Sequence, residues 1–163
     1  MEETPESTRE DLWRTLQSVS EWIRVADAKA GATLAVDGAL MALLASRLRG
    51  TTTLSLLSTF SLSTAIVIAA TSGLLAIWTV IPRTKRLGAD SMVHYGTIAA
   101  FESPAIYHEA ALTLYADSDA LTEALTKHIW VISRSARIKY MLATWAIRLL
   151  TAALVIGLLA LLL

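Results

Sequence analysis

The feature that most constrains this chain is a long stretch without a charged side chain, residues 60–81. Its sequence is FSLSTAIVIAATSGLLAIWTVI. A helix rises about 1.5 Å per residue, so a helix of this length crosses the roughly 30 Å hydrocarbon core of a bilayer. Residues 60–81 therefore predict a transmembrane helix.

Two further stretches have the same character. Residues 140–163 carry only Arg148 as a charged residue, and the shorter stretch 30–46 is interrupted only by Asp37. Hydrophobic residues make up 55% of the chain and the mean hydropathy is +0.54, which is more apolar than an ordinary soluble domain. We predict an all-α membrane protein with three transmembrane helices.

The distribution of basic residues predicts the orientation of these helices. Four basic residues precede residue 30 and seven lie between residues 83 and 139, against two in the loop 47–59. Since basic residues collect on the cytoplasmic side, we expect residues 1–29 and 82–139 inside and the C-terminus at the outer face. The acidic start MEETPESTRED does not resemble a signal peptide. We expect a multi-pass protein of the cell inner membrane with no domain outside.

The cytoplasmic segments carry helix-start signals and apolar stripes. Ser7 and Glu10 have the spacing of a capping box, Ser103 precedes a proline, and the Asp117-Ser-Asp sequence is a third start signal. Leu12, Leu16, Val19, Ile23 and, later, Leu121, Leu125 and Ile132 follow helical spacing. We predict a small helical cytoplasmic module formed by extensions of the first and last spans plus one short helix at 104–115.

Several kinds of chemistry find no support in the sequence. There is no cysteine, and no phosphate-binding loop sequence is present. His108 and Glu109 begin a helical zinc motif, but the second histidine is replaced by Leu112. The formal net charge is zero, which argues against nucleic-acid binding. We expect no enzymatic activity, no metal and no cofactor.

The sequence ADAKA places Asp27 and Lys29 at the cytoplasmic mouth of the first span. Alone, these residues can be a solvated acid and an anchoring lysine. Other basic residues occur at the same level of the other helices, and the combined set can bind either anionic lipid headgroups or the phosphate of a small ligand. The candidate binding residues are Asp27, Lys29, Arg83, Arg86, Arg134, Arg137 and Lys139.

Asp37 is an acid within an apolar span and requires a partner or water. Asp37 lies eight residues after Lys29, and Arg148 lies nine residues after Lys139. If both lysines mark the inner interface, both charges lie at a similar depth, and we predict an intramembrane Asp37–Arg148 pair. The alternative is that Arg148 extends to the headgroups and Asp37 is protonated.

Four blocks of the chain resemble the transmembrane effectors of bacterial Pycsar antiphage systems. They are WIRVADAKAGATL (22–34), IPR (81–83), IAAFESPAIYHEAALTL (98–114) and HIWVISRSARIKYMLATWAIRLL (128–150). The resemblance covers nearly the whole chain except the N-terminal arm and the outer loop. The order of the blocks is more specific than any single block.

The resemblance implies an effector whose functional partner is a pyrimidine cyclase. The cyclase makes cyclic UMP or cyclic CMP on infection, and the effector responds by impairing the inner membrane, which causes cell death and abortive infection. For such a ligand, we expect Trp130, Tyr95 or Phe101 to stack on the base. A homo-oligomer in the lipid bilayer is expected. The alternatives are a structural or adaptor membrane protein, or a holin-like pore former, neither of which binds a nucleotide.

Overall fold

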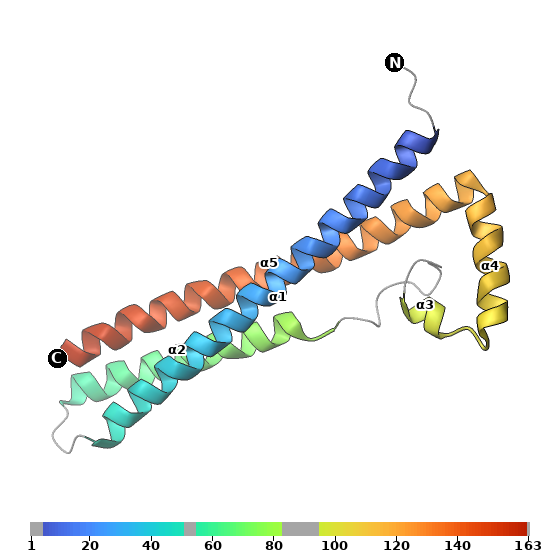
Figure 1. Ribbon diagram of the computed structural model, residues 1–163. Coiled ribbons are helices and arrows are strands. Elements are labelled where there is room, and N and C mark those ends of the chain that lie inside the picture. Colours follow the sequence, from blue (N-terminus) through green and yellow to red (C-terminus); the bar gives the residue numbers. More distant parts are fainter. Residues whose placement is uncertain (1–4, 51–54, 83–94, 163) are drawn as a thin grey trace. The chain divides into compact units, whose positions relative to one another are not determined.

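The computed structural model describes residues 5–50, 55–82 and 95–162 (Figure 1). These residues form five helices and no strand: α1 Pro5–Gly50, α2 Leu56–Val80, α3 Tyr95–Ala99, α4 Pro104–Ala116 and α5 Ser118–Leu162. Helices α1, α2 and α5 are long and apolar enough to cross a membrane. The predicted all-α class with three spanning helices is confirmed.

The chain divides into two compact units. We call the first, Met1–Ile23 with Pro82–Arg137, the helical module, and the second, Arg24–Ile81 with Ile138–Leu163, the transmembrane bundle. Helices α1 and α5 contribute residues to both units.

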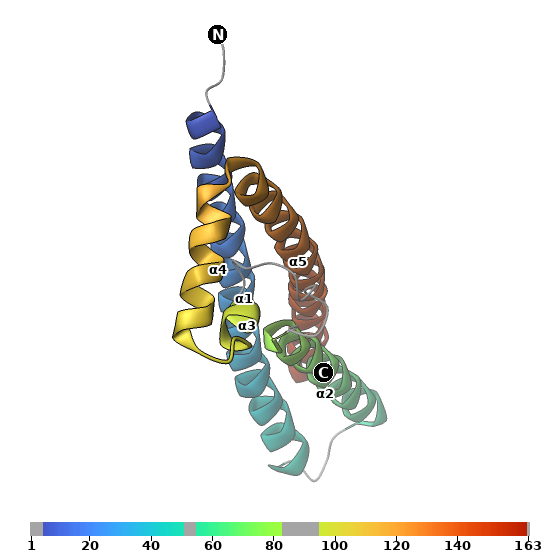
Figure 2. The same ribbon diagram turned by 90° about the vertical axis from the view of Figure 1, so that its right-hand side faces the viewer.

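The helical module has its own apolar core. Leu16 and Val19 of α1 are buried together with Leu121, Leu125 and Ile132 of α5, and Leu114 of α4 packs against them. The two predicted apolar stripes therefore pack on each other and on α4. Figure 1 shows α4 meeting α5 at a sharp turn, and α3 lies beside the N-terminal end of α4 in Figures 1 and 2.

Two of the three predicted helix starts are confirmed. The Ser103 hydroxyl accepts a hydrogen bond from the Ile106 amide at 3.3 Å before α4. The Asp117 carboxylate accepts from the Asp119 and Ala120 amides in the first turn of α5, both at 3.0 Å. These oxygens satisfy amides that have no partner within the helix. The predicted start at Ser7 is wrong, because α1 already begins at Pro5.

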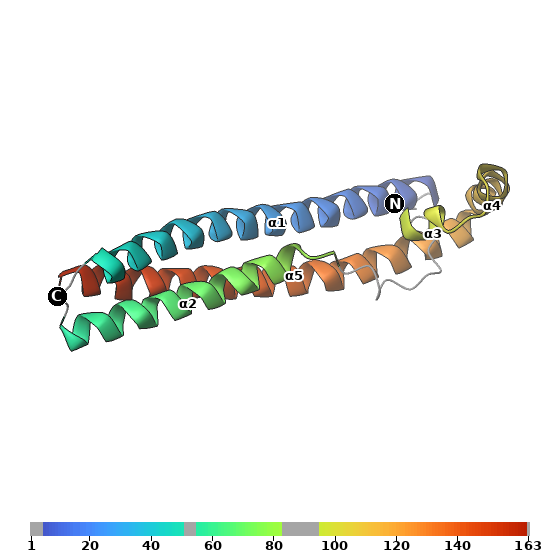
Figure 3. The same cartoon turned by 90° about the horizontal axis from the view of Figure 1, so that it is seen from below.

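The transmembrane bundle packs α1, α2 and α5 side by side, as Figures 1 and 3 show. The end of α1, the start of α2 and the C-terminus of α5 lie at the same end of the bundle, so α1 and α5 run in the same direction. Small side chains fill much of its interior and allow close helix contact: Ala30, Ala65, Ala69, Ala76, Ala146, Ala153 and Ala160.

Large apolar side chains lie exposed on the outside of the bundle. Phe60, Val67, Leu74, Val155 and Leu158 are each more than half exposed. An exposed apolar surface of this kind suits lipid and not water.

The helices also extend beyond the apolar stretches that predict them. Helix α1 continues through Arg47 and Arg49 to Gly50. These basic residues in its last turn interact favourably with the negative end of the helix dipole. Ser55 then begins α2, its hydroxyl accepting from the Ser58 amide at 3.1 Å.

Candidate functional site

The first polar contact of the transmembrane bundle joins α1 to α5. Lys139 Nζ donates to both carboxylate oxygens of Asp27, at 2.6 and 2.8 Å. The lysine side chain is only 7% exposed and that of Asp27 is 32% exposed. The carboxylate supplies the counter-charge that a lysine so deeply buried requires.

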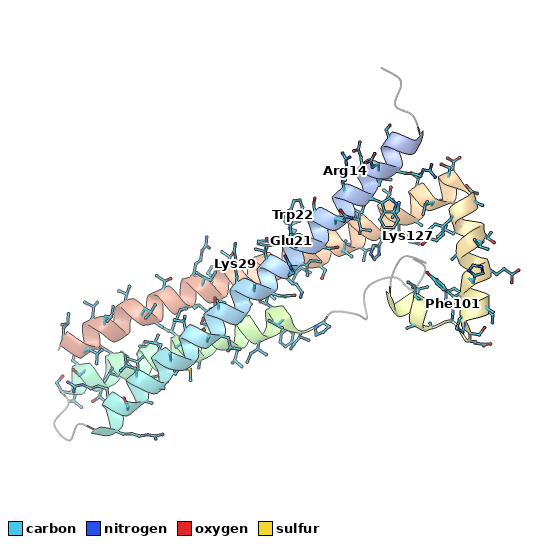
Figure 4. The ribbon with its side chains drawn as sticks, in the orientation of Figure 1. Arg14, Glu21, Trp22, Lys29, Phe101 and Lys127 are labelled. Atoms are coloured by element: carbon cyan, nitrogen blue, oxygen red, sulfur yellow. The ribbon has the colours of Figure 1, made fainter. Side chains whose placement is uncertain are left out.

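Lys29 is two residues from Asp27 but has a different environment. Its side chain is exposed (Figure 4), and its Nζ lies 5.5 Å from the centre of the Tyr140 ring. An ammonium group at this distance is attracted to the face of the aromatic ring. The ADAKA sequence therefore supplies one paired acid and one solvent-accessible cation.

The second polar contact is formed by Asp37, which is 1% exposed. Its Oδ2 lies 2.7 Å from the Ser72 hydroxyl of α2, and that hydroxyl lies 2.8 Å from the carbonyl oxygen of Ala146 in α5. Asp37 Oδ1 is buried without a hydrogen-bond partner among the described residues. One polar cluster thus joins all three helices of the bundle.

The predicted Asp37–Arg148 ion pair is not formed. The Arg148 guanidinium lies 5.2 Å from the centre of the Trp145 ring on its own helix. Ala146 faces the Asp37 cluster, and two residues rotate a helix by about 200°. Arg148 is therefore on the opposite side of α5 and is exposed.

The remaining candidate residues belong to the helical module or lie outside the described residues. Arg134 lies 5.0 Å from the centre of the Trp130 ring, and Arg137 is exposed. Phe101, labelled in Figure 4, makes an edge contact with Tyr107 at 5.4 Å between ring centres. The predictions for Arg83, Arg86 and the Tyr95 side chain fall outside the described part of the chain.

Two partners of these charged residues are not evident from the sequence alone. Ser72 is central to the Asp37 cluster, and Tyr140 lies beside Lys29. The sequence feature that points to Ser72 is its position next to Gly73, in a part of the span that is rich in small residues. An added Cβ at Gly73 would lie 3.6 Å from Leu34 and 3.9 Å from Asp37, so α1 and α2 approach closely at this level.

Three apolar helices joined by buried polar contacts define a multi-pass α-helical membrane protein. A family model described as PycTM, the Pycsar effector protein domain, matches residues 11–163. The chain therefore belongs to the Pycsar effector family and is an effector of antiphage defence. No curated protein and no solved structure matches it.

Proposed function

We propose that this effector senses a cyclic pyrimidine mononucleotide, cyclic UMP or cyclic CMP, and responds by impairing the inner membrane. The resulting cell death would end the infection. Membership of the Pycsar effector family supports this function, as does a chain in which three helices can span a bilayer. The protein would itself catalyse no reaction, and a pyrimidine cyclase would supply the ligand.

The observation that carries the proposal at the level of residues is the buried Asp27–Lys139 pair. A cyclic mononucleotide has one phosphate anion, which is the kind of group that binds a lysine ammonium. Lys29 is exposed and can receive this anion first. A phosphate that reaches Lys139 competes with Asp27 and weakens the contact between α1 and α5.

Ligand binding would in this way act directly on the packing of the spanning helices. Removing one charge from a buried ion pair is strongly unfavourable unless a new counter-charge takes the place of the lost one. The phosphate provides that counter-charge for Lys139, while Asp27 can become hydrated because it is partly exposed. Arg134 and Arg137 are separate phosphate candidates on the helical module.

The orientation and the assembly are part of the proposal. An N-terminus inside and a C-terminus at the outer face agree with the distribution of basic residues. Self-association is supported by α1, where Gly31 and Gly38 are exposed and have no described atom within 4 Å of an added Cβ. Exposed small residues permit close approach of a second copy.

Calorimetric titration of the detergent-solubilised protein tests the ligand. Cyclic UMP, cyclic CMP, cyclic AMP and cyclic GMP are compared, and we expect binding of one or both pyrimidine nucleotides. Absence of binding by all four would refute the sensor function. Membrane leakage that needs no ligand would instead favour the holin-like alternative.

Variants then test the residues. Lys29→Ala should abolish toxicity when a pyrimidine cyclase is co-expressed, while membrane insertion is retained. Lys139→Met removes the contact that the ligand is proposed to break and should therefore be toxic without the cyclase. Arg14→Ala is the matched control, because it removes an exposed cation of the helical module whose partners among the described residues are Glu10 and Asp11 of α1. If Lys29→Ala kills cells as efficiently as the control, the ADAKA region is only an anchor. If Lys139→Met still needs the cyclase to kill cells, the Asp27–Lys139 pair is not the contact that the ligand breaks.

A further inference from the structure

The Ser72 hydroxyl lies between two oxygen atoms of neighbouring helices. One is Asp37 Oδ2 of α1 at 2.7 Å, and the other is the Ala146 carbonyl oxygen of α5 at 2.8 Å. Two other buried hydroxyl groups of the bundle bond to their own helix: Thr33 donates to the Lys29 carbonyl and Thr79 to the Leu75 carbonyl, each at 2.9 Å. Ser72 of α2 instead forms its contacts with α1 and α5 and so connects three helices.

The two contacts of Ser72 can be satisfied together only if Asp37 carries a proton. A serine hydroxyl has one hydrogen to donate, and a carbonyl oxygen has none. If Ser72 donated to an ionised Asp37, its oxygen and the Ala146 carbonyl oxygen would face each other at 2.8 Å without a hydrogen between them. If Asp37 is protonated, it donates to Ser72 and Ser72 donates to Ala146.

The surroundings of Asp37 favour the same state. Its Oδ1 has no hydrogen-bond donor among the described residues, and an ionised carboxylate would need donors on both oxygens. The neighbouring α2 presents Ser72 and Gly73 to it, and α5 presents the Ala146 carbonyl. Arg148, the cation predicted to pair with Asp37, lies against Trp145 instead.

We propose that Asp37, Ser72 and the Ala146 carbonyl form a proton-binding site that locks the three helices of the transmembrane bundle together. Loss of the proton would reverse the Ser72 hydrogen bond, leave the Ala146 oxygen facing the serine oxygen, and place an unpaired charge in the interior. Water would have to enter to solvate that charge. The bundle would therefore loosen as the proton leaves.

The direction of the pH effect follows from proton linkage. In the folded bundle Asp37 holds its proton, whereas in the unfolded chain a hydrated aspartate is ionised at neutral pH. When the folded state binds more protons than the unfolded state, the free energy of unfolding falls as the pH rises. The bundle should lose stability with increasing pH until Asp37 is ionised, and Asp37→Asn, which keeps a neutral donor of similar shape, should remove this dependence.

Infrared spectroscopy of the protein in lipid bilayers tests the proton directly and requires neither the ligand nor toxicity. At neutral pH we expect the C=O stretching band of a protonated carboxylic acid, shifted when the protein is labelled with ¹³C-aspartate. Aspartates in water are ionised and give no such band. The band should be absent from Asp37→Asn and move to higher frequency in Ser72→Ala, where the acid loses its acceptor.

The labelled wild-type protein decides the question even if the variants fail to insert. Absence of a label-sensitive acid band at neutral pH would show that Asp37 is ionised and would overturn the proposal. A band that is unchanged in Ser72→Ala would equally contradict the assigned hydrogen bond. Disappearance of the band at high pH together with loss of bundle stability would establish that the proton on Asp37 holds the three helices together.

Discussion

A double-mutant cycle on Asp27 and Lys139 should reveal a strongly coupled pair. Asp27→Asn leaves a lysine that is 7% exposed without a counter-charge. Breaking a buried ion pair in this way costs about 3–5 kcal/mol. Since Asp27 is 32% exposed and the pair is not fully desolvated, we expect a loss at the lower end, about 3 kcal/mol.

The other variants of the cycle should cost less. Lys139→Met leaves a carboxylate that water can reach, so about 1–2 kcal/mol is expected. The double variant removes both charges and puts an apolar side chain in the lysine position. Its free energy of unfolding should stay within about 1 kcal/mol of the wild type, as when other buried ion pairs are replaced by apolar side chains. The expected coupling between Asp27 and Lys139, which is the sum of the two single losses minus the loss in the double variant, is therefore about 4–5 kcal/mol.

The measurement is the free energy of unfolding in bicelles, from titration with a denaturing detergent followed by tryptophan fluorescence. The matched control is the Glu10–Arg14 pair, which has a similar distance of 2.7 Å but side chains that are 66% and 68% exposed. Its coupling should be only about 0.3–0.5 kcal/mol. Equal coupling in the two pairs would refute the argument that burial makes the Asp27–Lys139 contact strong.

Two further predictions concern packing and orientation. Gly157→Ala should destabilise the bundle by about 1 kcal/mol, because the new Cβ would lie 3.1 Å from Leu44 in a packed core. Gly31→Ala should stabilise it by up to about 1 kcal/mol, because the new Cβ has no described atom within 4 Å and alanine favours the helix more than glycine does. The same unfolding titration compares them, and a loss at Gly31 as large as that at Gly157 would contradict the assigned packing. A reporter that is active only in the cytoplasm should be silent after residue 163 and active near Asp117; the reverse pattern would refute the proposed topology.

The membrane class and the helix starts follow from the sequence because they depend on local properties. An uncharged stretch such as residues 60–81 has few alternatives to a spanning helix. The signals at Ser103 and Asp117 act within one turn, so the structure forms the predicted hydrogen bonds. Ser7 shows the limit of such signals, since the helix begins before it.

The partners of the buried charges were decided only by tertiary structure. Sequence spacing gives the depth of Asp37 and Arg148 along parallel helices, and depth alone made them a plausible pair. It does not give the rotation of each helix about its axis. Because neighbouring residues differ by about 100° in direction, α5 turns Ala146 toward Asp37 and Arg148 away from it, and the acid meets Ser72 of α2 instead.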